Sequence, residues 1–163
     1  MIIYISGKIG EEVISEATRK KFMRARDTLL KMGHKVYDPT DPNFQEDLKK
    51  HVDIEEEKWK EESDLTFDRY ARILLFDLHF VALSDAVLML EDWNDSPGAR
   101  SEHEFAKSTG KKVFYTDYKK VEEMLVREWL AIDGNDEMNW QKGIKAAKKY
   151  VHEHIREHYI HIV

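Results

Sequence analysis

A turn-forming segment followed by a carboxylate is the part of this sequence best suited to chemistry. Ser96-Pro97-Gly98 follows an apolar run at 86–90 and leads directly into a helical pattern that contains Glu102. Open α/β sheets bind their ligands at the carboxyl edge of the parallel strands, where strand-to-helix turns of this kind lie. A glutamate held there could attack or stabilise a sugar carbon, so Glu102 is the leading candidate for a catalytic residue.

These residues also have a structural interpretation. A Ser-Pro-Gly segment is first of all a turn, and a glutamate in the first turns of a helix is favoured by the helix dipole. The Ser96 hydroxyl and the backbone N–H groups beside it could instead hold a phosphate at the start of the helix. Only the combination of these features favours a ligand site over an ordinary helix start.

A second strand-to-helix turn lies at the N-terminus. The strand pattern of residues 2–6 stops at Gly7, and Lys8 and Ile9 follow before Gly10. Such a turn can bring backbone N–H groups up to an anion, but structural turns need glycines too. The segment matches neither the GxxxxGK[ST] nor the GxGxxG pattern. Lys8 could contact a phosphate or be an ordinary exposed lysine.

Asp77 is the third candidate, because it lies among apolar neighbours in the helical pattern of residues 68–83. A carboxylate in such surroundings would be partly buried and would need partners. Helix packing and a functional role are equally compatible with this position. Asp85, eight residues later, is better explained as a residue at the entrance of the next strand.

Hydrophobic patterning predicts the elements that position these residues. Strands are expected at residues 2–6, 34–38, 86–90 and 113–115, and helices at 11–32, 68–83 and 101–108. The strand–helix–strand order implies right-handed crossovers and a parallel sheet. The expected fold class is therefore α/β.

Two segments lie outside this alternation. Residues 41–66 carry a charged run, which is typical of a solvated helical insertion and is also compatible with a lid over a pocket. The few apolar anchors of this run are Phe44, Leu48, Val52, Ile54 and Trp59. Residues 119–163 show helical patterns at 120–131 and 139–158, a turn at 133–136 and no strand signal.

Composition narrows the class of protein. The net charge of −6 argues against a general grip on a nucleic-acid backbone, although a local pocket can oppose the global sign. The absence of cysteine excludes disulfides, thiol catalysis and cysteine-type zinc sites. No apolar run approaches the roughly 20 residues of a membrane span, and the N-terminal one is too short for a signal peptide. We expect a soluble cytoplasmic protein with neither nucleic-acid polymer nor membrane as partner.

Histidines offer a weaker alternative. Four of them crowd the C-terminus, and His154 and His158 lie one helical turn apart, which could bind zinc. There is no HExxH motif and no supporting cysteine, so a solvated helix end explains them better and no metal site is expected. His103 follows Glu102, but neighbouring side chains on a helix point in different directions.

In their order and spacing these motifs resemble the nucleoside 2-deoxyribosyltransferase-like superfamily. The resemblance is carried by Tyr4-Ile5-Ser6-Gly7, by Asp77 ahead of Asp85, and by Gly98-xxx-Glu102-xxx-Ala106 before Gly110-Lys111-Lys112-Val113. The stretch 83–90, with Trp93 and 96–100, is more specifically similar to an uncharacterised bacterial and phage branch. The resemblance covers residues 1–118 and implies a flavodoxin-like (Rossmann-like) parallel sheet flanked by helices, with 119–163 as a helical C-terminal extension.

The resemblance also implies roles for single residues. Glu102 matches the catalytic glutamate that attacks the anomeric carbon of a (deoxy)ribosyl group, and Asp77 matches an aspartate near the base and the glycosidic bond. Tyr4 and Gly7 match residues that line the pocket. Transferases acting on free nucleosides have an aspartate six residues before the glutamate, whereas nucleotide hydrolases have a serine, because a carboxylate would repel phosphate. Ser96 occupies that position and favours a 5′-monophosphate.

Several positions depart from the family pattern. The hydrolases usually continue the first glycine turn with serine and a nearby arginine, where this chain has Lys8 and Gly10. The transferases' Gly-Thr pair is Gly98-Ala99 here. Arg100 follows and could form a bidentate pair with phosphate, or could pair with Glu104 or another surface carboxylate.

The function expected from the resemblance is hydrolysis of the N-glycosidic bond of a (deoxy)nucleoside 5′-monophosphate. Glu102, Asp77 and Tyr4 would be the catalytic residues. The substrate-binding residues would be Gly7, Lys8, Ile9, Trp93, Ser96, Gly98 and Arg100, although core packing is the usual role of a tryptophan. The reaction needs no metal or organic cofactor.

Three alternatives stay open. The chain could be a deoxyribosyltransferase acting on free nucleosides, a protein that binds a nucleotide signal without cleaving it, or an interaction protein that uses its helical tail. By resemblance we expect a homodimer or higher homo-oligomer, with the amphipathic segment 119–131 as the candidate contact.

Overall fold

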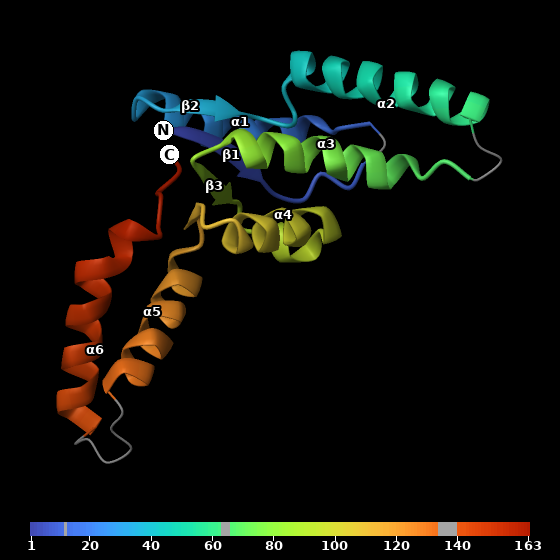
Figure 1. The fold of residues 1–163 in the computed structure, drawn as a ribbon. Helices are drawn as coiled ribbons and strands as arrows, with labels where there is room; N and C mark the ends of the chain where they lie inside the picture. Colours follow the sequence, from blue (N-terminus) through green and yellow to red (C-terminus); the bar gives the residue numbers. More distant parts are fainter. Residues whose placement is uncertain (12, 63–65, 134–139) are drawn as a thin grey trace.

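Four short parallel strands form one sheet in the order β2-β1-β3-β4 (Figure 1). The computed structural model describes residues 1–11, 13–62, 66–133 and 140–163. The strands are β1 (Ile2–Ser6), β2 (Lys35–Tyr37), β3 (Ala86–Met89) and β4 (Lys112–Tyr115). The helices are α1 (Glu16–Lys31), α2 (Pro42–Glu62), α3 (Arg69–Leu83), α4 (Pro97–Ser108), α5 (Tyr118–Asp133) and α6 (Trp140–His154), with two short 3₁₀ turns, η1 (Trp93–Asp95) and η2 (Ile155–Glu157). The predicted α/β class is confirmed.

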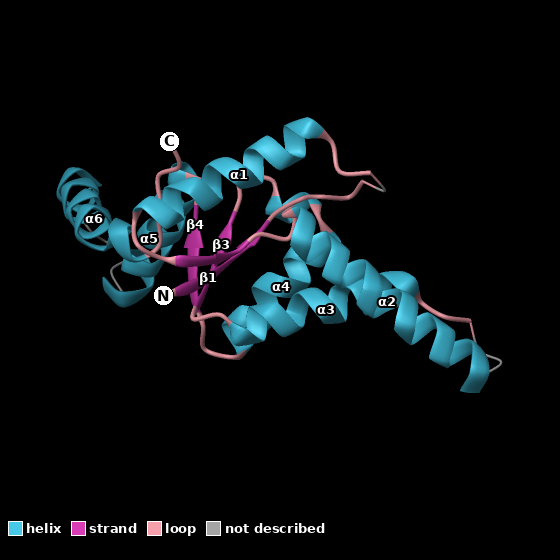
Figure 2. Cartoon of the chain, turned by 90° about the horizontal axis from the view of Figure 1, so that it is seen from above, coloured by secondary structure: helices cyan, strands magenta, loops and turns pink. Residues whose placement is uncertain are grey.

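The two faces of the sheet are covered differently. Figure 2 shows α1 on one face and α3 with α4 on the other. Side chains alternate along β1, so Ile3 and Ile5 pack toward α1, while Tyr4 lies in the core that faces α3 and α4. The last residue of β1, Ser6, shares the face of Tyr4 and is likewise buried.

The chain segments at the carboxyl ends of β1 and β3 are hydrogen-bonded to each other and closely packed. The order 2-1-3-4 reverses direction between these strands, which is where open α/β sheets bind ligands. The Leu90 N–H donates to the Ser6 carbonyl oxygen at 2.8 Å. A Cβ added to Gly7 would lie 3.0 Å from Cδ1 of Leu90, so the turn after β1 packs tightly because residue 7 is glycine.

Two helices begin elsewhere than the sequence pattern predicts. α1 starts at Glu16 rather than at residue 11, because the Ser15 side chain caps it by accepting from the Thr18 N–H. α4 starts at Pro97 rather than at residue 101, because Ser96 is its N-cap. Glu102 is therefore in the second turn of α4.

The charged segment after β2 forms a single helix, α2, that runs beside α3 (Figure 1). Phe44, Leu48 and Val52 recur on its buried face. The Phe44 ring packs against Phe80 with 4.8 Å between centroids. Ile54, expected as an anchor, is exposed instead.

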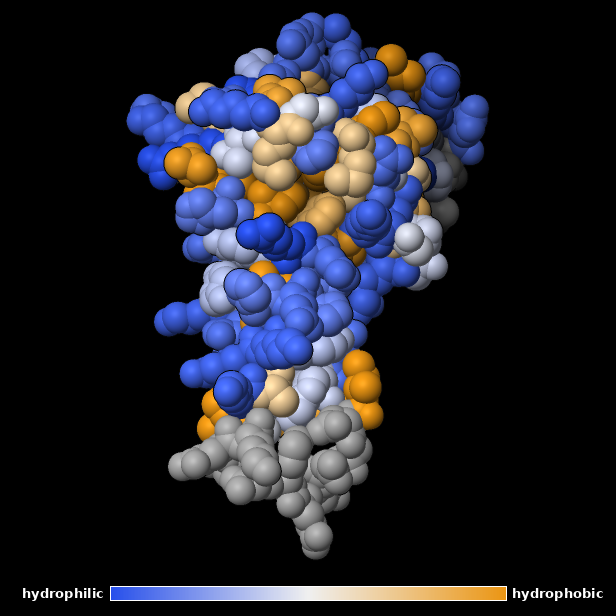
Figure 3. Space-filling view, turned by 90° about the vertical axis from the view of Figure 1, so that its left-hand side faces the viewer, coloured by the Kyte–Doolittle hydropathy of each residue, from blue (hydrophilic) through white to orange (hydrophobic). Residues whose placement is uncertain are grey.

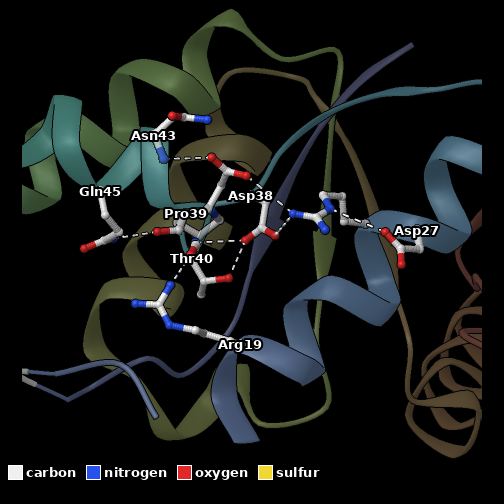
Figure 4. Close-up of polar contacts among 9 residues, drawn as sticks. Arg19, Asp27, Asp38, Pro39, Thr40, Asn43 and Gln45 are labelled. Atoms are coloured by element: carbon white, nitrogen blue, oxygen red, sulfur yellow. Dashed lines mark hydrogen bonds and ion pairs between the residues drawn. The ribbon is translucent and has the colours of Figure 1, made fainter. Parts of the chain in front are cut away.

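The loop from β2 to α2 is held by a polar network (Figure 4). An Asp38 carboxylate oxygen accepts from the Thr40 N–H at 2.8 Å and from the Thr40 hydroxyl at 2.7 Å. From α1, Arg19 donates to the Thr40 carbonyl oxygen at 2.9 Å, and Arg26 lies 3.5 Å from the other Asp38 oxygen. The start of α2 is thereby fixed against α1.

α5 and α6 form a hairpin that projects away from the sheet (Figure 1). After it the chain returns to β4, where the Tyr115 N–H donates to the His158 carbonyl oxygen and the Ile160 N–H donates to the Tyr115 carbonyl oxygen. Tyr159 forms a single parallel bridge with Tyr115. The predicted helical C-terminal extension is confirmed, but its last residues return to the sheet edge because the apolar Ile160 joins the core on the α1 side.

Part of the predicted tail lies outside the described residues, namely the turn at 134–136 and the start of the last helix at residue 139. That helix ends at His154, and a 3₁₀ turn follows it. Among the described helices, none is both long enough and apolar enough to span a bilayer.

Candidate functional site

Four polar side chains from three elements meet near the carboxyl ends of β1 and β3. The Tyr4 hydroxyl donates to Oε1 of Glu102 at 3.3 Å, and the Ser6 hydroxyl donates a short hydrogen bond to Oε2. Asp77, from α3, interacts with the same Tyr4 hydroxyl and with Glu102. The structure therefore brings together the three residues expected to be catalytic and adds Ser6 to them.

Each of these side chains reaches the site by regular spacing. Tyr4 and Ser6 are two residues apart on β1 and so share one face. Glu102 lies on the buried face of α4, between Ala99 and Ala106. An ionisable group occupies a position where the helix would otherwise place an apolar side chain.

Glu102 is buried, and Asp77 is half-buried with one carboxylate oxygen shielded from water. The exposed fraction of Glu102 is 6%. Oδ1 of Asp77 is buried and has no hydrogen-bond partner among the described residues. A carboxylate oxygen that is shielded from water and accepts no hydrogen bond disfavours the ionised form of the group.

Burial shifts the protonation of the whole cluster. It raises the pKa of Glu102 from 4.5 to about 7, against the opposing effect of the hydrogen bonds from Ser6 and Tyr4. The pKa of Asp77 is also raised well above its usual value, first by burial and then by the nearby charge of Glu102. The pKa of Tyr4 is also raised well above its usual value, mainly by burial and then by the two carboxylates.

The hydrogen bonds in the cluster favour the ionised form of Glu102 over that of Asp77. Glu102 accepts two hydrogen bonds, which stabilise its ionised form. Oδ1 of Asp77 accepts none. The pair thus combines a carboxylate with a neutral carboxylic acid, the arrangement that acid–base and nucleophilic steps require.

The first turn of α4 gathers further polar groups. The Ser96 hydroxyl accepts from the Ala99 N–H at 3.2 Å, which leaves its own proton available. A Cβ added to Gly98 would lie 3.3 Å from the Tyr70 hydroxyl and 3.8 Å from the Ser96 hydroxyl. Tyr70 was not predicted, although it lies seven residues before Asp77 and so on the same side of α3.

The loop after β1 is tied to the loop after β3. The Lys8 N–H donates to Oδ1 of Asp92 at 3.1 Å, and Lys21 bridges the Lys8 carbonyl oxygen and Asp92. Gly7 is buried beneath this contact, and Ile9 packs on the α1-side core. The Lys8 side chain is exposed, and it forms no ion pair within the described chain. Asp92, which holds this loop, was not singled out from the sequence.

Trp93 lies in packed surroundings. Its ring stacks on His103 with 4.3 Å between centroids, and the Lys120 ammonium lies 4.5 Å from the ring centre. His103 is also hydrogen-bonded to the Tyr115 hydroxyl at 2.8 Å. Burial lowers the pKa of His103 and favours its neutral form.

The expected partner of Arg100 is corrected by the structure. Its guanidinium donates to the Asn94 carbonyl oxygen at 2.6 Å. Glu104, the surface carboxylate considered for it, contacts His103 at 3.0 Å instead. α4 begins earlier than predicted, so Arg100 lies in its first turn and reaches back to the loop before it.

Two clefts lie beside the sheet, and neither is lined by Glu102 or Asp77. One, of about 430 Å³, lies between Trp93 and α5. The other, of about 810 Å³, lies between α1 and the C-terminal tail. Across the described ranges no cluster of three or more histidine, aspartate or glutamate residues is arranged to hold a metal ion.

Comparison with protein-family profiles matches residues 1–115 to a family described as Domain of unknown function (DUF4406). This match covers the whole sheet and the four polar residues of the cluster. No curated protein and no solved structure matches the chain.

Proposed function

The chain belongs to the DUF4406 family, a domain of unknown function, and we propose that it hydrolyses the N-glycosidic bond of a (deoxy)nucleoside 5′-monophosphate. The observation that carries the proposal is the pair of carboxyl groups, buried Glu102 and half-buried Asp77, which both interact with the Tyr4 hydroxyl. Glycosidic cleavage uses two carboxyl groups in different protonation states. The resemblance to the deoxyribosyltransferase-like superfamily supports a nucleotide as the substrate.

In the proposed reaction the ionised Glu102 attacks the anomeric carbon of the sugar. The C–N bond breaks, its electron pair passes to the base, and Asp77 donates a proton to the departing base nitrogen. Water then attacks the same carbon, gives its proton to the Asp77 carboxylate and releases Glu102 from the glycosyl ester. Ser6 and Tyr4 orient the attacking carboxylate throughout.

The first turn of α4 supports recognition of a 5′-phosphate. Ser96, Gly98 and the Tyr70 hydroxyl gather there without a carboxylate among them. Gly98 precedes Glu102 by four residues, which corresponds to roughly 6 Å along a helix. A sugar whose anomeric carbon meets Glu102 could thus extend its 5′ end toward this turn.

The test is release of free base from a panel of ribonucleoside and deoxyribonucleoside 5′-monophosphates, followed by chromatography. We expect the wild-type protein to release base from at least one nucleotide and Glu102→Gln to release none. Base release that survives Glu102→Gln would contradict the proposal, as would inactivity on the whole panel. Base exchange between a free nucleoside and an added base would assign the transferase activity instead.

A further inference from the structure

A second cleft lies on the face of the sheet opposite the acid pair. It encloses about 810 Å³ between α1 and the C-terminal tail, which lie on the same side of the sheet (Figure 2). One wall is a single face of α1, since residues 17, 20, 21 and 24 recur at helical spacing. The other wall is formed by the start of α5 and the tail, and Leu90 lies at the end of β3 between them.

The cationic side chains of this cleft are only partly neutralised. Lys20 pairs with Glu16, and Lys21 pairs with Asp92. Arg24, on α1, and Lys119, on α5, line the same volume from different walls. Neither of these two forms an ion pair or side-chain hydrogen bond within the described residues. Two unpaired cations in a chain of net charge −6 mark a local reversal of sign.

Two carboxylates also border the cleft, but one of them is already engaged. Asp117 accepts from the Lys120 N–H at 3.1 Å and so caps the start of α5. Glu91 is the other, and it is exposed. The lining side chains carry four positive charges against two negative ones, and Arg24 and Lys119 are the cations that have no ion-pair partner among the described residues.

The cleft also has an aromatic wall. Tyr118 is 46% exposed and meets Tyr159 edge to face with 5.4 Å between ring centroids. The Tyr159 hydroxyl is hydrogen-bonded to His161 at 2.9 Å, which holds this ring in place. A partly exposed ring beside two free cations matches the chemistry of a ligand that combines a phosphate with an aromatic group.

We propose that the cleft between α1 and the C-terminal tail binds a nucleotide-like phosphorylated aromatic molecule. Arg24 and Lys119 pair with its phosphate, and its ring stacks on Tyr118. The cleft volume is in the range of pockets for small organic ligands. The site is separate from Glu102 and does not depend on the hydrolase activity proposed above.

The test is titration of adenosine 5′-monophosphate into the Glu102→Gln protein, followed by calorimetry and by backbone amide NMR. We expect shifts at residues 17–24 and 116–119, and at least a tenfold loss of affinity in both Arg24→Glu and Lys119→Glu. Lys31→Glu, a charge reversal at the far end of α1, is the matched control and should bind normally. Tyr118→Ala should weaken the nucleotide more than inorganic pyrophosphate.

The inference is overturned if adenosine 5′-monophosphate does not bind at this cleft, or if the charge reversals leave its affinity unchanged. No binding at all would overturn it, and so would shifts confined to the surroundings of Ser96 and Glu102, or equal affinity in both charge reversals. The two proposals fail separately, because wild-type protein that releases no base from any nucleotide can still bind the probe between α1 and the tail.

Discussion

Glu102 is an acidic residue on the buried face of a helix, and the two hydroxyl groups that donate to it explain how the fold tolerates it. Burying a charge is costly unless hydrogen bonds stabilise it. Ser6 and Tyr4 supply those bonds but do not cancel the cost, since the pKa of Glu102 is still raised to about 7. The protein thus retains a carboxyl group that titrates near neutral pH.

This raised pKa predicts a dependence of stability on pH. The folded protein holds the Glu102 proton more tightly than the unfolded chain does. The contribution to the free energy of unfolding is therefore present below about pH 4.5 and is lost as the pH rises to about 7. Relative to wild type, we expect the free energy of unfolding of Glu102→Gln, which does not titrate, to rise by about 2.5 kcal/mol between pH 5 and pH 8. Urea unfolding of both proteins at pH 5 and pH 8 measures the difference in free energy of unfolding between variant and wild type. The same difference at both pH values would contradict the prediction.

Ser6 gives a prediction for activity. Its hydrogen bond lowers the pKa of Glu102, so Ser6→Ala should raise that pKa above about 7. Because the proposed reaction needs an ionised Glu102, the rising limb of the kcat/KM profile should move to higher pH, while the rate well above it should recover toward the wild-type value. Ser101→Ala, on the same helix but outside the cluster, is the control. A uniform loss of rate at every pH would show that Ser6 acts only in folding.

The sequence predicts part of this cluster and misses the rest for a physical reason. Asp77 stands out as a carboxylate among apolar neighbours, and Glu102 as a carboxylate just after a glycine-bearing strand-to-helix turn. Ser6 does not, because a serine at the end of a strand is unremarkable until the pairing of β1 with α4 is known. Tyr70 also depends on how α3 packs on α4, which no local pattern records.

At the scale of elements, Ser96 is the N-cap of α4 and, in the proposed reaction, also a contact for the substrate phosphate. One substitution separates these two roles. Aspartate is as good an N-cap as serine, but its charge would repel a phosphate. We expect the free energy of unfolding of Ser96→Asp to lie within a few tenths of a kcal/mol of the wild-type value. The KM for a nucleoside monophosphate should nevertheless rise at least tenfold. Free nucleosides should be unaffected or preferred.

Ser96→Ala is the matched control for this experiment. It should lose about 1 kcal/mol of stability through the missing cap, with a smaller effect on KM than the aspartate variant has. Unfolding curves and KM values for nucleotide and nucleoside together decide the matter. If the KM for the nucleotide is unchanged in Ser96→Asp, the phosphate does not bind at this turn.

The position of α2 depends on the Asp38 network of Figure 4. Asp38→Ala would leave the buried Thr40 N–H and hydroxyl without their acceptor, so we expect a loss of about 1–3 kcal/mol in the free energy of unfolding. Asp38→Asn keeps an acceptor oxygen and should lose less. Thermal and urea unfolding compare the two, and equal losses would show that the charge beside Arg26 matters more than the accepting oxygen.

Sequence patterns predict which helices and strands exist better than they predict the residues at which these elements begin and end. The strands and the helix order follow from apolar spacing, but the starts of α1 and α4 depend on which serine caps the backbone. The return of the chain to β4 involves only a short segment around Tyr159, flanked by His158 and His161. A short strand signal is present there and is easily overlooked beside the long helical pattern, since the segment contains the strand-forming residues Tyr159, Ile160, Ile162 and Val163.

At the scale of the whole molecule, the sheet carries the acid cluster on one face and the cationic cleft on the other. The acid cluster lies on the side of α3 and α4, and the cationic cleft lies on the side of α1. The α1 face is covered by one helix and the tail, which leaves room there for the cleft. The reversal of strand order between β1 and β3 places the acid cluster where a parallel sheet opens to ligands.

The projecting hairpin gives the last prediction. On the face shown in Figure 3 it is mainly hydrophilic, with apolar side chains near its far end. Leu130 and Ile132 of α5 are 54% and 69% exposed, within or next to the segment expected to join two copies of the chain.

We expect a dimer with twice the mass of the 19.3 kDa chain. The double variant Leu130→Lys, Ile132→Lys should dissociate, because two charges would be buried at the contact. Sedimentation velocity measures the mass, and Leu75→Lys, an equally exposed leucine on α3, is the control. A monomeric wild-type protein, or a dimer that survives the double substitution, would show that this end of α5 is not the contact.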